Sequence, residues 1–594
     1  MTDLSKYIKA PLSANAARYA DAELRKIEKS FGSLLDFART RPWVDAVETY
    51  GLIGDGVKDN TSAFAKMFAA GGQALFLRRG SYITGKFSIP SNTILYLDPG
   101  VRIIDSGVLG VNDRFVNIVG VDAIHIVGWG AKIEMNRVDY GSGEQRHAIN
   151  IRTATNVLIE GVQISGSGGD GIYIGSTSGP CVNVCINSCI SDNNRRQGCS
   201  IVSGKRIRLI NSEFTNTNGT APAAGIDVEP NSSSDSLEDI KIIACRCVGN
   251  EGSGIEIFLS AWNSSSNYVD LEVSSLYTRD NGAVSQSGRL RPGIDINRIG
   301  NSTPCKGRIR IIDAICIDEL QAGVHVYDWH DSGPLVELIR PTIINPNQAD
   351  GTSSVINGGI ILHNSGSHTS TPGNIRIIDA VVIDDDDFLN SNSLGVMRIS
   401  GVWSKTEIHN PKYVYAGANP WVIDSTALPR FICNPELFAP QTGNITITDG
   451  RYLGRVITNA GASGSISVTL IQATSARIGW RLSFEVFAAQ TLGIAPNGAD
   501  KIVPLADGYS AGTSIKSTIR GSRLVLECRQ AGYWHIVEIS GEWAIDPGSG
   551  TPPTYTVTNV TTDRSYDANA TTLDELADVL GTLINDLRER GRLR

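Results

Sequence analysis

The chain has 594 residues, a formal net charge of −8 and an isoelectric point near 5.6. Its acidic balance, without a basic stripe, argues against a nucleic-acid-binding protein, and the absence of any run of about 18 apolar residues argues against a membrane span. The 62 glycines and 4 methionines favour many turns and short strands over long helices.

The first 43 residues contain YADAELRKIEKSFGSLLDFART, in which apolar residues recur at roughly helical spacing. We expect a helix here, either as a simple cap of the next domain or as a segment that attaches to a larger assembly. No apolar stretch of the kind found in a secretory signal precedes it.

Residues 44–405 carry a repeat in which a small residue, usually glycine, is followed by an apolar, a variable and an apolar residue. The copies are HAINI (147–151), DGIYI (170–174), QGCSI (197–201), AGIDV (224–228), SGIEI (253–257), PGIDI (292–296), AGVHV (322–326) and GGIIL (358–362).

A second alternating run lies between most of these copies, as in VLIEGVQIS (157–165) and IRIIDAIC (309–316). Short alternating runs with turn-rich joints indicate strands, and their regular recurrence predicts an all-β parallel β-helix. In such a solenoid the inward side chains form a continuous core, and the outward ones stack at about 4.8 Å per coil.

The segment GDGVKDNTSAFAKMFAAGGQALFLRRGSYIT begins this region. Through Gly54, Asp55, Gly56, Asp59 and Thr61 it resembles the leading segment of the pectate-lyase-like β-helix superfamily, which is common in bacteriophage tailspikes. The resemblance covers roughly residues 45–400. It implies a right-handed single-stranded β-helix and a homotrimer, and it is far less specific for chemistry than for fold.

Two further regions follow. Residues 406–545 show short alternating strands and are expected to form a C-terminal β-sandwich. Residues 546–594 comprise a Pro/Gly linker and TTLDELADVLGTLINDLRERG, an amphipathic helix whose leucines at 573, 576, 580, 583 and 587 approximate a seam. A terminal helix too small to fold alone suggests oligomerisation.

The resemblance to tailspikes also implies partners and location. We expect a virion tail protein that meets a host surface polysaccharide, joins the phage tail or baseplate through its N-terminus and acts outside the bacterium. Host lysis releases a phage protein, so a missing secretion signal fits a virion protein better than a secreted enzyme.

Alignment of the repeats places outward acids at one position of consecutive copies. Asp227, Glu256 and Asp295 fall in a single column, and Glu229 lies two residues after Asp227 on the same strand face. Like charges on neighbouring strands repel, so such a column needs a shared proton, a cation or a function. We expect these four residues to be catalytic.

Aromatic and basic residues near the column are the candidates for substrate binding: Tyr173, Arg196, Trp262, His325, Tyr327 and Trp329. Each has a structural alternative, because tryptophans in loops often pack and a lone histidine is usually structural. The sequence predicts no metal site and no cofactor. The spacings of the ten cysteines do not resemble zinc sites, and buried reduced thiols are expected.

Three functions remain open at this point. Paired carboxylates favour glycoside hydrolysis, with inversion preferred over retention. A polysaccharide lyase would instead need a base and an arginine or a cation to neutralise a uronate, roles for which Tyr173, His325, Arg196 and Arg291 are available. A non-catalytic tail protein would bind a receptor and leave the acidic column as surface decoration.

Overall fold

The computed structural model describes residues 25, 42–283, 291–299, 304–348, 358–365, 371–384, 397–400, 403–415, 421–423, 430–432, 438–448, 450–453, 455–503, 514–546 and 572–589. The expected N-terminal helix therefore lies outside the described residues, apart from Arg25. Among the helices that are described, none has the length and hydropathy of a membrane span.

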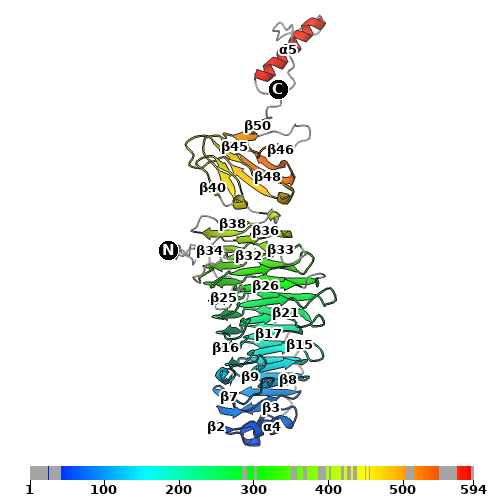
Figure 1. The fold of residues 1–594 in the computed structure, drawn as a ribbon, viewed down its shortest axis with the longest axis vertical. Coiled ribbons are helices and arrows are strands. Elements are labelled where there is room, and N and C mark those ends of the chain that lie inside the picture. The colour runs from blue at the N-terminus through cyan, green and yellow to red at the C-terminus, as the bar shows by residue number, and fades with distance from the viewer. Residues whose placement is uncertain are drawn as a thin grey trace.

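Three parallel sheets wind around one core and form a parallel β-helix (Figure 1). Sheet A contains β1 (Val44–Asp45), β3 (Ala74–Leu77), β6 (Thr93–Leu97), β9 (Asp122–Val127), β12 (Thr155–Glu160), β15 (Cys181–Asn187), β18 (Gly204–Ile210), β21 (Leu237–Ile243), β24 (Val269–Ser274), β27 (Gly307–Ile312), β30 (Leu335–Ile339), β33 (Gly373–Ile378), β36 (Ser404–His409) and β39 (Arg430–Ile432).

Sheet B contains β2 (Asp55–Asp59), β4 (Gly80–Thr84), β7 (Val101–Asp105), β10 (Lys132–Glu134), β13 (Gln163–Ser165), β16 (Ile190–Asp192), β19 (Glu213–Thr215), β22 (Arg246–Val248), β25 (Tyr277–Arg279), β28 (Ile315–Ile317), β31 (Thr342–Ile344), β34 (Val381–Asp384) and β37 (Lys412–Tyr415). Sheet C contains β5 (Phe87–Ser88), β8 (Val116–Val119), β11 (Ile149–Arg152), β14 (Ile172–Gly175), β17 (Cys199–Ile201), β20 (Ile226–Val228), β23 (Ile255–Leu259), β26 (Ile294–Ile299), β29 (Val324–Tyr327), β32 (Ile360–His363), β35 (Met397–Ser400) and β38 (Trp421–Ile423).

The core of the solenoid consists of stacked inward side chains, mostly isoleucine, leucine and valine. The nine described cysteines are all free and buried, as the sequence predicted, and several belong to this core. Burial raises the pKa of thiols such as Cys189, to about 12, so these thiols are inert packing groups.

The coil turns from sheet A to sheet B with the same short joint in every turn from β12 to β36. Two residues separate the strands, and the first of them has a positive φ in each case: Gly161, Ser188, Asn211, Ala244, Ser275, Asp313, Arg340, Asp379 and Asn410. A single left-handed residue therefore makes this corner.

The N-terminal end is closed by α3 (Ala46–Tyr50) and α4 (Thr61–Ala69), which buries Phe64, Met67 and Phe68. The motif residues that carry the family resemblance build this end. Asp55 accepts hydrogen bonds from the backbone N–H groups of Val57 and Lys58, and Asp59 accepts from the Thr61 hydroxyl at 2.5 Å. Their role is to shape turns.

The solenoid extends further than the sequence indicated. We expected it to end at residue 405, but β36 to β39 continue all three sheets as far as Ile432. These last coils lack the small–Gly–apolar signature, so the repeat alignment could not detect them.

Residues 438–546 form two further sheets beyond the solenoid (Figure 1). One contains β40 (Phe438–Pro440), β42 (Val456–Thr458), β44 (Arg481–Glu485), β48 (Arg523–Gln530), β49 (Tyr533–Ser540) and β46 (Lys501–Val503). The other contains β41 (Ile445–Thr446), β43 (Ile466–Thr469), β45 (Leu492–Ala495), β47 (Ser514–Ser517) and β50 (Ala544–Asp546). A sandwich packing of these sheets stays a prediction. The terminal helix is α5 (Leu573–Glu589).

Candidate active site on sheet C

The outward face of sheet C carries one polar residue per strand from β8 to β29. The paired positions are Asn117, Asn150, Tyr173, Ser200, Asp227, Glu256, Asp295 and His325. The predicted register is therefore confirmed, and three carboxylates occupy consecutive strands. We call Asp227, Glu256 and Asp295 the carboxylate column.

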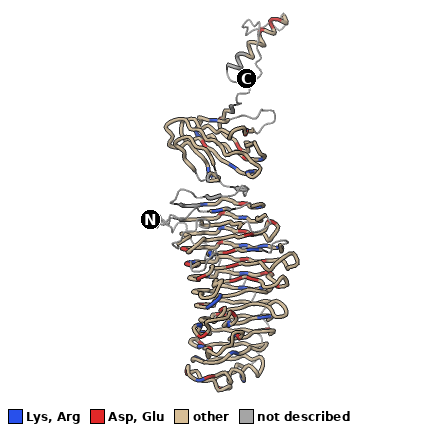
Figure 2. Tube along the Cα trace, in the orientation of Figure 1, with Lys and Arg blue, Asp and Glu red and all other residues tan. Residues whose placement is uncertain are grey.

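Sheet A shows how this solenoid arranges charges that have only a structural role. Its outward column alternates in sign through Glu272, Arg310, Glu337, Arg376 and Glu407 on consecutive strands. Neighbours form ion pairs, including Arg310 with Glu272 at 2.6 Å and Arg376 with Glu337 at 3.1 Å. Acidic and basic positions are interspersed along the solenoid trace (Figure 2). This alternation holds from β21 to β36, since β18 and β21 pair two bases, Arg208 and Lys241. The carboxylate column differs from the alternating part, because its three acids share one sign.

Asp227 on β20 is only 2% exposed. Its Oδ2 accepts a hydrogen bond from Nε2 of Gln197 at 2.9 Å, and its buried Oδ1 has no hydrogen-bond partner among the described residues. Burial, reinforced by Glu229 and Glu256, raises the pKa of Asp227 well above its usual value, against the opposing effect of Arg196. The surroundings of Asp227 therefore favour the protonated form of its carboxyl group.

Glu229 lies two residues beyond Asp227 and is partly exposed. Residues i and i+2 of a strand share a face and lie about 6.6 Å apart along the chain. Glu256 pairs with Asp227 from the neighbouring strand β23, where the backbones are about 4.8 Å apart, and is 3% exposed. Of these carboxylates, Glu229 is the one in contact with water.

Asp295 has both oxygens engaged. Oδ1 lies 3.0 Å from Nδ1 of His325 on the next strand, and Oδ2 accepts from Nδ2 of Asn297 at 3.0 Å. Asp295 is 0% and His325 3% exposed. The arrangement fixes the imidazole, whose buried Nε2 has no hydrogen-bond partner among the described residues. The predicted catalytic Asp295 is thus placed to orient His325.

Two residues before the column were missed as parts of the site. Asp170 and Gln197 come directly before the repeat glycine in DG and QG, and this position is the signal that could have identified them. Asp170 is fully buried, accepts from the Ser200 hydroxyl at 2.9 Å and lies 3.4 Å from NH1 of Arg196. Burial raises the pKa of Asp170 to about 6.

The remaining candidates divide into two groups. Arg196 lies beside Asp170 with its side chain 18% exposed, and Tyr327 lies partly exposed two residues after His325. The ring of Tyr173 is stacked on His147 at 4.7 Å and is 8% exposed. These three residues do lie on the face of the carboxylate column.

The two tryptophans do not reach this face, and their predicted role in sugar stacking is wrong. Trp262 is 0% and Trp329 1% exposed, and both belong to the hydrophobic core. Their indole N–H groups donate to backbone carbonyls, Trp262 to Ser232 at 3.0 Å and Trp329 to Pro334 at 2.9 Å. With no exposed ring face, they close loops over the core.

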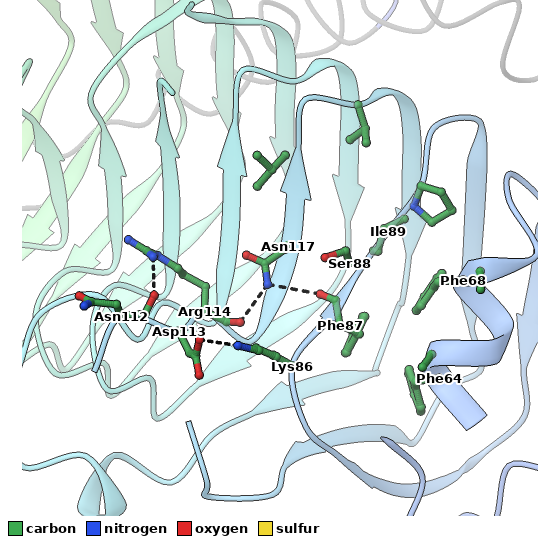
Figure 3. Close-up of a pocket in the computed structure, with 15 residues that line it drawn as sticks. Phe64, Phe68, Lys86, Phe87, Ser88, Ile89, Asn112, Asp113, Arg114 and Asn117 are labelled. Carbon is green, nitrogen blue, oxygen red and sulfur yellow. Dashed lines mark hydrogen bonds and ion pairs between the residues drawn. The ribbon is translucent and has the colours of Figure 1, made fainter. Parts of the chain in front are cut away.

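A groove of about 770 Å³ opens at the N-terminal end of the same sheet face (Figure 3). Its walls include Phe64 and Phe68 of α4, Ser88 and Asn117 from the outward column, and Arg114. Because Ser88, Asn117 and Asn150 pair on consecutive strands, the groove continues the column that contains Asp227. In the part of the chain that the structure describes, no cluster of three or more metal-binding side chains is present.

Comparison with known proteins agrees with this architecture. The family model described as right handed beta helix region matches residues 74–234 and, in a second overlapping match, residues 122–289. Together with the parallel strand order, the match identifies a right-handed parallel β-helix.

The SPbeta prophage-derived uncharacterized protein YorA of Bacillus subtilis (strain 168) is 26% identical over 268 residues, which covers 40% of this chain and 45% of YorA. The chain thus matches less than half the length of this relative. Among solved structures, the A-module of the mannuronan C-5 epimerase AlgE4 of Azotobacter vinelandii has a TM-score of 0.45 at 15% identity, covering 65% of this chain and 96% of the module. The pre-mature gene product 12 of bacteriophage phi29 has a TM-score of 0.43 at 14% identity, covering 77% of this chain and 67% of that chain.

Proposed function

We propose that this chain is a bacteriophage tail protein that hydrolyses a host surface polysaccharide on sheet C. The observation that carries the proposal is the carboxylate column, which holds three buried acids of one sign in register, whereas sheet A alternates its charges from β21 to β36. The tail context rests on the resemblance of residues 54–84 to tailspikes and on the prophage origin that the name of YorA gives.

Asp227 is the general acid. Its raised pKa favours the protonated carboxyl, and its Oδ1, which has no hydrogen-bond partner among the described residues, gives that proton to the glycosidic oxygen. As the proton moves, the bond between that oxygen and the anomeric carbon breaks. Glu229 is the general base, because it is the carboxylate in contact with water. It removes a proton from the water that attacks the anomeric carbon.

Spacing favours inversion of the anomeric configuration. Inverting glycosidases separate their two carboxyl groups by roughly 6.5–9.5 Å, whereas retaining ones use about 5 Å. The backbone positions of Asp227 and Glu229, the residue after the end of β20, are about 6.6 Å apart, which leaves room for a water between their carboxyl groups as inversion requires. Glu256 supports the reaction by keeping the pKa of Asp227 high, and Asp295 orients His325 beside the substrate.

The test is a cleavage assay on purified capsular polysaccharides and O-antigens, which follows new reducing ends and the ultraviolet absorbance of unsaturated sugars. We expect reducing ends without unsaturation, and proton NMR of the fresh product should show the inverted anomer. Asp227→Asn and Glu229→Gln should each lower kcat by about 10²- to 10⁴-fold.

Glu272→Gln and Glu337→Gln on sheet A are matched controls, because they remove a carboxylate from the same solenoid far from the column. Both should keep full activity. Unsaturated products would show that the reaction is elimination and not hydrolysis. Binding of a glycan that is never cleaved would show that the protein only binds a receptor.

A further inference from the structure

Two arginines face each other near the groove without a carboxylate to neutralise them. Arg114 precedes β8 and Arg152 ends β11, the next strand of sheet C, and both are half-buried. In the described residues, no Asp or Glu lies within ion-pair distance of either guanidinium, although the same solenoid pairs most of its other arginines. The nearest acid in sequence, Asp113, is bound to Lys86 at 2.5 Å (Figure 3).

Neutral groups hold the two guanidiniums in place. Oε1 of Gln145 accepts from NH2 of Arg114 at 2.5 Å and from NH2 of Arg152 at 3.4 Å, so one amide oxygen bridges both. Nε of Arg152 donates to Oδ1 of Asn150 at 2.9 Å. Its guanidinium carbon lies 4.4 Å from the ring centre of Tyr173, which supports the charge from one side.

The positive charge of this arginine pair lowers the pKa of neighbouring basic groups. Burial, and then the charge of Arg152, lowers the pKa of Arg114. Burial and three arginines, Arg114, Arg152 and Arg196, hold the pKa of His147 well below its usual value. The neutral imidazole accepts from the backbone N–H of Asp170 through Nδ1, so its proton is on Nε2, which has no acceptor among the described residues.

The arginine pair lies on the same face of sheet C as the carboxylate column. From Asn150, three strand steps lead through Tyr173 and Ser200 to Asp227. At about 4.8 Å per step, Arg152 is roughly 14 Å from the general acid and Arg114, which precedes β8, is one step further, a distance that one polysaccharide chain covers within a few sugar residues. A guanidinium pair with open N–H groups matches a planar or tetrahedral oxyanion.

We infer that Arg114 and Arg152 bind an acidic substituent of the polysaccharide, so that the substrate is an anionic glycan. The inference rests on the proposed function only in placing the polymer along sheet C. The shared chemistry is an oxyanion that accepts from two guanidiniums, and it is supplied either by the carboxylate of an acidic sugar or by a phosphate in the polymer backbone.

Binding of the full chain tests the inference without cleavage. The Asp227→Asn variant is applied to immobilised acidic and neutral bacterial polysaccharides. Each acidic polymer is also presented after carboxyl reduction and after removal of phosphate with hydrofluoric acid. Bound polymers should be acidic, and one of the two treatments should abolish binding; carboxyl reduction identifies a carboxylate and hydrofluoric acid a phosphate.

Arg114→Gln and Arg152→Gln, each added to Asp227→Asn, should weaken that binding by about 10- to 100-fold, as expected for loss of a hydrogen bond to a charged group. Arg102→Gln is the control, because Arg102 is half exposed on sheet B and paired with Glu134. Circular dichroism checks that each variant folds. Binding confined to neutral polymers, binding that survives both treatments, or two arginine variants with unchanged affinity would overturn the inference. Binding of an acidic glycan that the unsubstituted protein never cleaves would instead defeat only the proposed hydrolysis.

Discussion

Nδ1 of His325 lies 3.0 Å from Oδ1 of Asp295 across two neighbouring strands, with both side chains buried. Loss of either partner leaves a buried polar group unpaired, which costs about 1–3 kcal/mol. We predict that Asp295→Ala and His325→Ala each lower the free energy of unfolding. The decrease in the double variant should be smaller than the sum of the two single decreases, by at least about 1 kcal/mol. A urea-unfolding cycle measures this. Additive effects within 0.5 kcal/mol, roughly the error of such cycles, would mean that the pair does not interact energetically.

The same geometry ranks the four predicted catalytic acids. Asp295 has no oxygen left for a substrate, whereas Asp227 has a free Oδ1. Asp295→Asn should therefore retain far more activity than Asp227→Asn. If the order of the two kcat values is reversed, Asp295 is the acid and the assignment of Asp227 fails.

The pH profile depends on Glu256. Its charge helps to raise the pKa of Asp227, and a general acid works only while it is protonated. Replacing Glu256 by Gln removes a neighbouring negative charge, so the pKa of Asp227 falls. The alkaline limb of kcat against pH should move to lower pH while the protein stays folded. An unchanged limb would show that Glu256 does not control the acid.

Glu319 predicts a second pH effect, on stability. It lies fully buried beside Asn281, which also accepts a hydrogen bond from Asn250, and its carboxyl accepts from the backbone N–H of Asn281 at 2.9 Å. Burial raises the pKa of Glu319 from its usual 4.5 to about 8. Between these values the unfolded chain releases a proton that the folded chain keeps, so stability falls as pH rises, by at most about 1.4 kcal/mol per pH unit.

Glu319→Gln keeps the size and neutrality of the protonated side chain. The variant should be as stable as the parent at pH 5 and more stable at pH 8, which melting curves at both values measure. Asp318→Asn, at the neighbouring and partly exposed position, is the control. A parent whose stability does not change from pH 5 to pH 8 would contradict the prediction.

The leucines of α5 predict the oligomeric state. Leu573, Leu576, Leu580 and Leu583 are 46% to 85% exposed and repeat at intervals of three and four residues, which is the seam of a coiled coil. We predict a trimer in sedimentation equilibrium and dissociation by the double change Leu576→Asp and Leu580→Asp. The control Glu575→Gln should stay trimeric. If the double variant is still a trimer, the contacts that hold the trimer together lie elsewhere in the chain.

The sequence predicted the parts of the fold that repetition encodes. Alignment on the repeat glycine was sufficient to place Asp227, Glu256 and Asp295 on adjacent strands, because the side-chain alternation of a strand fixes the register. It could not predict burial. Trp262 and Trp329 follow strands of sheet C as exposed loop residues would, and only the folded loops show that the rings turn into the core.

The sequence also could not predict which side chains contact one another across different coils. Arg196 and Asp170 belong to different coils, and Gln197 meets Asp227 only because their strands are neighbours in sheet C. Arg114 lies outside the aligned repeats, so nothing in the alignment brought it next to Arg152. Such pairings depend on which joints close each coil, and those joints vary in length.

The corner between sheets A and B is constant from β12 to β36, although it has three residues between β6 and β7 and four between β9 and β10. It has two residues in nine successive turns, from the joint at Gly161 to the joint at Asn410, so an insertion there would displace two sheets at once. The other two corners border sheet C, and their lengths already differ within this one chain, from β14 ending at Gly175 before β15 at Cys181 to β23 ending at Leu259 before β24 at Val269. From β12 to β36 the differences in corner length therefore lie at the two margins of the sheet that carries the acids. An insertion at either margin would therefore lengthen a loop beside sheet C without changing the register of Asp227 and Glu256.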